Sequence, residues 1–294
     1  LRPVKETDIK SGKYRRIDVI GTDGIEKVYE GILRGEDGYE SHIIDAHGRD
    51  LGIAKHTKKK EVVSGDDIVL SIDYDLQLQA ELLLAGYRGV IICMDPQNGD
   101  VLVMANSPDF SLKNFIGPLK YSLWDEWNNS KDKPLVNRTT VGQYAPGSIF
   151  KLIGSFLFLD NPSFSKEETI DCKGKIFLED QSNPDKPHIF SCWDKTGHGK
   201  MNLRNAIKHS CNVFFYEKIL SLHKENDDIL DSFHQYAQKF GFGVNTGIEV
   251  FESKGKIPDI AYMYNNPGMG GKRGSLPNLI IGQGETLVTP IQII

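Results

Sequence analysis

The sequence predicts an α+β fold in which an antiparallel sheet is covered by helices. The first observation is a β-hairpin: Val90–Met94 and Val101–Met104 are apolar strands, and Asp95–Asp100 is a polar turn between them. The second is Ser148–Leu159, which is apolar on nearly every face and therefore predicts a buried helix. A hairpin beside a buried helix is typical of a sheet with helices packed on it.

The other expected elements follow from hydrophobic periodicity and capping residues. Glu61–Asp73 is rich in Val, Ile and Leu and predicts a strand, and Leu76–Leu84 has one apolar face and predicts a helix. A second helix is expected at Leu203–Leu222. A third is expected at Asp227–Phe240, closed by Gly241. The stretch 110–145 is expected to be a long loop.

Length and composition limit the domain organisation and the function. The chain has 294 residues, a net charge of −5 and 39% hydrophobic residues, which excludes the strongly basic surface of a nucleic-acid-binding protein. Residues 1–60 are polar and rich in turns, so we expect a small domain there and a large domain at 61–294. Thr289 and Pro290 predict the start of a helix at the end of the sequence, and we expect the chain to be a fragment.

Ser148 and Lys151 are candidate catalytic residues. Ser-x-x-Lys occurs several times in the chain, but only Ser148 opens an apolar helix directly after Pro146-Gly147. The N-terminal end of a helix favours a developing anion, and Lys151 lies one turn further on the same face. Burial lowers the pKa of a lysine and makes it a base for the serine proton. The alternative is a helix-capping serine and a lysine whose ammonium group reaches solvent.

Ser210-Cys211-Asn212 is the only Ser-x-Asn in the chain, and it lies inside the apolar stretch "AIKHSCNVFFYEKI". Polar side chains in such surroundings need hydrogen-bond partners. A serine that relays protons and an asparagine that holds a substrate would explain why polar side chains occur in this apolar stretch. The alternative is a hydrogen-bonded turn buried within a helix.

These motifs resemble the transpeptidase domain of class B penicillin-binding proteins, and the "Y-x-PGS-x-FK" form is more like the elongation (cell-shape) branch than the septal one. The resemblance implies the penicillin-binding transpeptidase fold, with 1–60 as part of an N-terminal pedestal. The segments that carry it cover most of the chain: "GIEKVYEGILRGEDG" (24–38), "SGDDIVLSIDYDLQLQAE" (64–81), "MDPQNGDVLVMANSPDF" (94–110), "PLVNRTTVGQYAPGSIFK" (134–151), "GHGKMNLRNAIKHSCNVFFY" (197–216), "FGFGVNTGIEV" (240–250) and "IGQGETLVTPIQ" (281–292).

The resemblance also implies an activity. Ser148 would attack the penultimate D-alanine of a stem peptide, Lys151 and Ser210 would move the proton to the departing D-alanine, and Asn212 would hold the acyl chain. An amine of a second stem would complete the crosslink, and β-lactams would trap Ser148. Expected partners are cell-shape complex proteins and a glycan polymerase, at the periplasmic face of the inner membrane with an N-terminal helical anchor outside this chain. No nucleic acid is expected.

Lys195-Thr196-Gly197 matches a K-[ST]-G motif that, in this family, follows Ser-x-Asn and lies on a strand. Here it precedes Ser210 and has no β-branched residues around it to form a strand. Lys10-Ser11-Gly12 is equally misplaced. We expect the family's triad beyond Ile294, so the truncated domain by itself would lack half of the oxyanion hole.

The cysteines suggest a second site. Cys93 lies in a predicted strand and is expected to be a buried apolar residue. Cys172, Cys192, His198 and Cys211 form a Cys₃His set of the type that binds structural zinc. The resemblance supports a metal, because some elongation-branch enzymes hold one here with Asp, His and Cys. A Cys172–Cys192 disulfide and free buried thiols are the alternatives, and no other cofactor is expected.

Two other functions remain open from the sequence. A β-lactam-hydrolysing or β-lactam-sensing domain shares the Ser-x-x-Lys motif, but such domains lack the roughly 140 residues that precede Ser148 here, by comparison with typical domain sizes. A scaffold that binds cell-shape partners through residues 1–60 is the third hypothesis.

Overall fold

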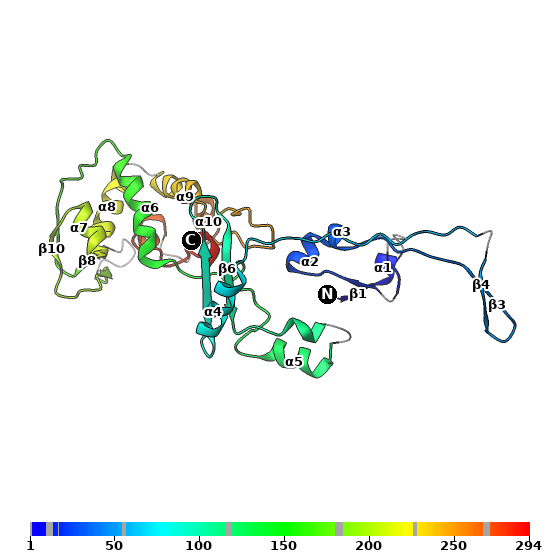
Figure 1. Ribbon diagram of the computed structural model, residues 1–294. Coiled ribbons are helices and arrows are strands. Elements are labelled where there is room, and N and C mark those ends of the chain that lie inside the picture. The colour runs from blue at the N-terminus through cyan, green and yellow to red at the C-terminus, as the bar shows by residue number, and fades with distance from the viewer. Residues whose placement is uncertain are drawn as a thin grey trace.

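The computed structural model describes residues 2–9, 14–16, 18–54, 57–115, 119–179, 185–225, 228–266 and 271–294. The molecule is elongated: the N-terminal segment forms a narrow extension at one end, and most of the helices gather at the other (Figure 1). The tip of the extension is the antiparallel hairpin of β3 (His42–Ile44) and β4 (Asp50–Ile53).

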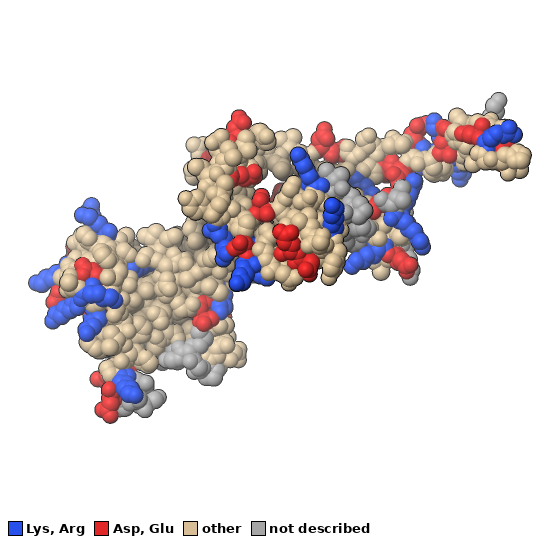
Figure 2. All heavy atoms as spheres, turned by 90° about the horizontal axis from the view of Figure 1, so that it is seen from below, with Lys and Arg blue, Asp and Glu red and all other residues tan. Residues whose placement is uncertain are grey.

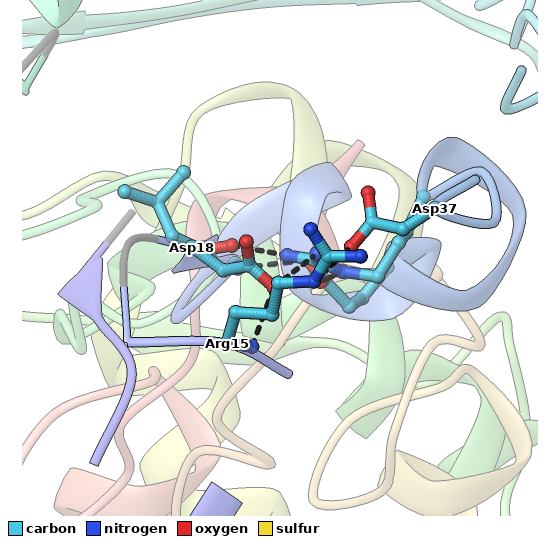
Figure 3. Close-up of polar contacts among 7 residues, drawn as sticks. Arg15, Asp18 and Asp37 are labelled. Atoms are coloured by element: carbon cyan, nitrogen blue, oxygen red, sulfur yellow. Dashed lines mark hydrogen bonds and ion pairs between the residues drawn. The ribbon is translucent and has the colours of Figure 1, made fainter. Parts of the chain in front are cut away.

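Polar contacts hold the base of the extension together. Its elements are short: β1 (Arg2–Pro3), α1 (Glu6–Ile9), β2 (Val19–Ile20), α2 (Gly24–Val28) and α3 (Glu30–Leu33). Arg15 Nε lies 3.1 Å from Asp37 Oδ2, and the Arg15 N–H donates to Asp18 at 2.9 Å (Figure 3). Arg34 pairs with both Asp18 and Glu30. The first buried apolar side chain among the described residues is Ala80, so this region has no apolar core of its own.

The strand expected at Glu61–Asp73 is wrong. The chain is extended there, but in the described part it forms only isolated bridges, between Glu36 and Val63 and between Tyr39 and Lys60. Val69 is 95% exposed. The Val and Ile residues have no core to face, because the segment does not enter a sheet. It runs beside residues 32–36 at one end and makes single hydrogen bonds to Val101 and Leu102 at the other.

The predicted hairpin is confirmed as β5 (Gly89–Met94) and β6 (Val101–Ser107). The helix before it, α4 (Tyr74–Leu84), is capped by Asp73, which accepts from the Leu76 N–H at 3.0 Å. Helix α4 packs on the hairpin through a small apolar cluster of Ala80, Leu84, Ile91, Val103 and Ala105. This is the sheet-and-helix arrangement that the sequence predicts, although each sheet in the described part of the chain has two strands.

Cys93 is exposed, so the expectation that it is buried is wrong. It lies near the end of β5, beside the irregularity in register between Cys93 and Met94, and outside the apolar cluster under α4.

The main core surrounds α6 (Phe150–Leu159), which contacts α8 (Asn212–Glu225), α9 (Ile229–Lys239) and α11 (Gly271–Ile280). Its largest fully buried side chains are apolar: Phe150, Phe158, Phe214, Phe215, Phe233, Ile219, Ile229, Leu230, Leu276, Leu279 and Ile280. One face of α6 is open, however, with Leu152 48% and Phe156 45% exposed. The prediction of a fully buried helix therefore fails on the face that these neighbours do not cover.

Two further expectations need correction. The loop expected at 110–145 contains η1 (Leu112–Phe115) and α5 (Tyr121–Asn129). The helix expected at Leu203–Leu222 is two helices, α7 (Leu203–Lys208) and α8, separated at residues 209–211.

The C-terminal helical predictions hold. Gly241 follows the C-cap of α9 with φ +84°, and Asp227, where that helix was expected to begin, lies outside the described residues. Helix α12 (Pro290–Ile293) begins after its N-cap Thr289, as expected. The remaining helix is α10 (Ile260–Asn265). None of the helices that the structure describes has both the length and the apolar character that crossing a bilayer requires.

Candidate active site

Ser148 lies at the entry to the main apolar helix. It is in the short turn η2 (Gly147–Ile149), which runs directly into α6. Gly147 has φ +62°, a conformation that favours glycine, and its N–H donates to the Gly282 carbonyl at 2.9 Å. The Pro146-Gly147 pair therefore turns the chain sharply into the helix and places the Ser148 side chain at its N-terminal end.

Lys151 is buried at the centre of a polar cluster, with 2% of its surface exposed. Its Nζ lies 3.2 Å from Ser148 Oγ, 2.9 Å from Ser210 Oγ and 2.7 Å from the Ser210 carbonyl oxygen. It also lies 2.6 Å from Asn212 Oδ1. Burial lowers the pKa of Lys151 to about 8, although the nearby thiols of Cys192 and Cys211 act in the opposite direction. This lysine can therefore act as a base near neutral pH.

Ser210 occupies the break between α7 and α8 in a left-handed conformation, with φ +50°. Such a conformation costs a residue other than glycine roughly 1–2 kcal/mol. The Cys211 N–H still donates to the Ala206 carbonyl, at 2.9 Å, so the chain stays compact across the break. The Ser210 hydroxyl donates to Ser148 Oγ at 2.9 Å. The break thus brings Ser210 into contact with Ser148.

Asn212 begins α8 and completes the polar cluster. Its Oδ1 accepts from Lys151, its Nδ2 donates to the Ser191 carbonyl at 3.4 Å, and its N–H donates to Cys192 Sγ at 3.3 Å. The structure thus brings together all four predicted catalytic residues. Two come from η2 and α6, and the other two come from the break before α8 and from the start of α8. This arrangement can remove a proton from Ser148 and return it through Ser210.

The predicted cysteine and histidine ligands also lie close together, next to this polar cluster. Cys172 ends β7 (Ile170–Cys172), Cys192 follows β9 (His188–Ser191), and His198 precedes β10 (Gly199–Met201). Together with Cys211, their ligand atoms all lie within 4.8 Å of one another. The structure forms no disulfide among the four cysteines, all of which lie in its described part.

The donor set fits a tetrahedral zinc ion. The His198 Nδ1 atom lies 3.6 Å from Cys172 Sγ and 3.5 Å from Cys192 Sγ. Bond lengths typical of zinc place sulfur and nitrogen ligands about 3.6 Å apart in a tetrahedron. Burial raises the pKa of Cys192, but the backbone N–H groups of Val213, Asn212 and Asp194 lower it more, so the net shift favours the thiolate that a metal binds. Burial raises the pKa of Cys211 to about 12, which a bound cation would offset.

The Lys195-Thr196-Gly197 segment forms bends between β9 and β10, as its sequence predicts, and belongs to no strand. Gly197 has φ +89°, and a Cβ there would overlap the Cys172 carbonyl oxygen. The backbone of this segment therefore lies directly against the backbone of residues 172–174, with no room for a side chain between them. Lys10-Ser11-Gly12, the other K-[ST]-G match, lies outside the described residues.

Two residues beside these sites were not predicted from the sequence as site residues. Trp193 donates from its indole N–H to the His209 carbonyl at 3.0 Å, and its ring packs edge-on against His198, with ring centroids 5.1 Å apart. Gly282 has φ +67°, and a Cβ on it would lie 2.8 Å from the Gly147 nitrogen. The two glycines of "IGQG" indicate that the backbone approaches another segment closely, but nothing in the sequence shows that this segment contains Gly147.

The chain matches two known protein families. The family described as the penicillin binding protein transpeptidase domain matches residues 89–294, and the penicillin-binding protein dimerisation domain matches residues 2–70. The chain belongs to the penicillin-binding protein transpeptidase family. A relative is the peptidoglycan D,D-transpeptidase MrdA of Acinetobacter baumannii, 34% identical over 95% of this chain and 40% of that protein.

Solved structures agree with this family assignment and its fold. The complex of penicillin-binding protein PBP2 with MreC from Helicobacter pylori has a TM-score of 0.81 and 30% identity, over 98% of this chain and 51% of that one. A structure described as showing the coordination of polymerization and crosslinking by a peptidoglycan synthase complex has a TM-score of 0.80 and 28% identity, over 100% of this chain and 51% of that one. The chain thus spans about half the length of these transpeptidase-family structures.

Proposed function

We propose that the protein is a peptidoglycan D,D-transpeptidase that acts through an acyl-enzyme on Ser148. The contact of the buried Lys151 amine with both Ser148 Oγ and Ser210 Oγ, at 3.2 and 2.9 Å, carries this proposal. A lysine with a pKa of about 8 can activate a serine without a histidine. The name of the A. baumannii relative supports the same activity.

In the first half-reaction, neutral Lys151 accepts the Ser148 hydroxyl proton as Oγ attacks the carbonyl carbon of the penultimate D-alanine. The oxygen of that carbonyl gains negative charge, which the Ser148 N–H at the helix entry stabilises. When the C–N bond breaks, the Ser210 hydroxyl donates a proton to the leaving amine and takes one from Lys151. D-alanine departs, and the stem peptide remains as an ester on Ser148.

In the second half-reaction, an amine of a neighbouring stem peptide attacks the ester carbonyl. The amine loses a proton to the Lys151–Ser210 pair, and Ser148 Oγ regains one as it leaves, so a peptide bond forms and the enzyme is restored. A β-lactam imitates the D-Ala-D-Ala end, but its leaving group stays attached, and the Ser148 ester persists. Asn212 would hold the acyl chain of either.

The function is tested by incubating the full-length protein with stem pentapeptide and an acceptor amine. D-alanine release in equal amount to the crosslinked product, lost in Ser148→Ala, is the expected result. Release of D-alanine with water as the only acceptor would indicate a hydrolase. Absence of release from a folded protein would favour a scaffolding function. Rapid hydrolysis of the penicilloyl ester would instead favour the β-lactamase alternative.

We also propose that Cys172, Cys192, His198 and Cys211 hold a structural zinc ion. Zinc would supply a fixed tetrahedral crosslink between the loops that carry these residues. Cys211 lies between Ser210 and Asn212, and Cys192 accepts the Asn212 N–H. The ion would therefore fix the segment that presents both catalytic side chains.

The structural neighbours suggest where the protein works. One neighbour was solved with MreC, and another is described as part of a peptidoglycan synthase complex. These support a cell-shape protein and a glycan polymerase as partners of this chain, and a role in cell elongation. A transpeptidase acts on peptidoglycan outside the cytoplasm, so we place the protein at the periplasmic face of the inner membrane.

A further inference from the structure

The segment Gly282–Val288 holds the turn that presents Ser148 from two sides. At one end, the Gly282 carbonyl accepts the Gly147 N–H at 2.9 Å. At the other, Val288 exchanges two backbone hydrogen bonds with Tyr144, at 2.8 and 2.9 Å. The residue before the nucleophile and the residue four positions before it are therefore both bonded to this segment.

Gly282 packs so closely that a side chain there would force the neighbouring backbone to shift. A Cβ would overlap the Gly147 carbonyl oxygen and lie 2.9 Å from Phe150 Cβ. A shift of the segment would therefore displace the Gly147 backbone and, with it, Ser148.

Between these two contacts, the segment is anchored by the side chain of Glu285. Its carboxylate contacts Lys256 Nζ and accepts from the Tyr262 hydroxyl at 3.1 Å, and Lys256 Nζ lies 3.2 Å from that hydroxyl. The backbone of Lys256 exchanges hydrogen bonds with Leu287, at 2.6 and 2.8 Å. The hydrogen bond from Lys256 lowers the pKa of Glu285, so the carboxylate is charged at neutral pH.

We propose that Glu285, held by Lys256 and Tyr262, is a positioning residue for Ser148. The cluster fixes the part of the segment that lies between its contacts with Gly147 and Tyr144. The Glu285 carboxylate contacts Lys256 and Tyr262 and not Ser148, and it acts by keeping Ser148 Oγ within reach of Lys151 Nζ. The inference rests on the proposed acylation of Ser148.

The test measures acylation of the full-length protein by a fluorescent penicillin, with binding (Kd) separated from the rate constant of the covalent step. We expect Glu285→Gln and Lys256→Met each to lower the covalent rate constant about tenfold, because small misplacements of a reacting group are costly. Kd should change less than twofold. The conservative Glu285→Asp should recover most of the rate, and Glu285→Gln with Lys256→Met should be no worse than either alone.

A matched control is Glu36→Gln, which breaks the Lys60–Glu36 pair at 3.0 Å in the N-terminal extension. It should leave the covalent rate constant unchanged. An unchanged rate constant in folded Glu285→Gln, or a rise in Kd alone, would overturn the positioning role. If Glu285→Gln does not fold, Tyr262→Phe decides by the same criteria. Failure of the unmodified protein to acylate Ser148 would instead refute the proposed function.

Discussion

Ser148 and Ser210 are 62 positions apart in the sequence, yet their hydroxyl oxygens lie 2.9 Å apart. Lys151 Nζ lies within 3.2 Å of both. One amine can therefore take the proton of the nucleophile and pass it to the second hydroxyl without moving. The covalent chemistry proposed for this chain depends on this contact.

The first prediction concerns pH. Lys151 must be neutral to act as a base, and burial lowers its pKa to about 8. We expect the covalent rate constant for a β-lactam to level off above pH 8 and to fall about tenfold per pH unit well below it. Stopped-flow acylation between pH 6 and 9 measures this. Arginine does not deprotonate in this range, so Lys151→Arg should be inactive throughout, and a flat profile in the unmodified protein would contradict the role of Lys151.

The second prediction separates the chemistry of Ser210 from its backbone strain. Both Ser210→Ala and Ser210→Gly remove the relay hydroxyl and should slow acylation about 10²-fold or more. Because φ is +50° at this position, the glycine variant should be more stable than the alanine variant by about 1 kcal/mol. Acylation rates and urea unfolding measure the two effects. Ser221→Ala, an exposed position on α8, is the control: it should leave the acylation rate unchanged and change stability by no more than about 0.5 kcal/mol.

The third prediction compares two glycines that lie eight positions apart. Gly282→Ala places a methyl group against the Gly147 backbone at φ +67° and should destabilise the protein by about 2 kcal/mol or more and slow acylation. Gly274 lies in α11, and a Cβ there meets nothing within 4 Å. Gly274→Ala should therefore be stabilising by about 0.5–1 kcal/mol. Thermal unfolding of both variants measures the difference, and equal effects would contradict the described packing of Gly282.

The fourth prediction concerns the metal. Protein purified without added metal should contain one zinc per chain by mass spectrometry, and Cys192→Ala with His198→Ala should contain none. Loss of zinc should slow acylation, because the proposed ion would fix the segment around Cys211. Cys93→Ala is the control, since Cys93 is exposed and outside the cluster. Absence of metal together with two missing free thiols would mean a Cys172–Cys192 disulfide and would refute the zinc proposal.

The proximity of Ser148 and Lys151 could be predicted because its signals are local. Pro146-Gly147 before an apolar helix indicates a sharp entry, and a spacing of three places Lys151 on the same face as Ser148. The break at Ser210 could not be predicted in the same way, because Leu203–Leu222 reads as one helix. Ser210 has a left-handed conformation, and its carbonyl oxygen accepts a hydrogen bond from Lys151, a residue distant in the sequence.

The errors in the fold prediction have a related cause. The Val and Ile pattern of Glu61–Asp73 is typical of a strand, but a strand needs neighbours, and periodicity does not show whether they exist. Cys93 is apolar enough for a core, but the fold leaves it exposed and outside the apolar cluster under α4. The contact of Gly282 with Gly147 joins residues far apart in the sequence, and only the folded chain reveals it.

Mass spectrometry of the full-length protein after reaction with a penicillin is the most direct measurement. A single, persistent penicilloyl adduct on the peptide that contains Ser148, absent in Ser148→Ala and much reduced in Lys151→Ala, is the expected result. An adduct on another residue, or no adduct on a protein shown to be folded, would contradict the assignment of Ser148 as the nucleophile.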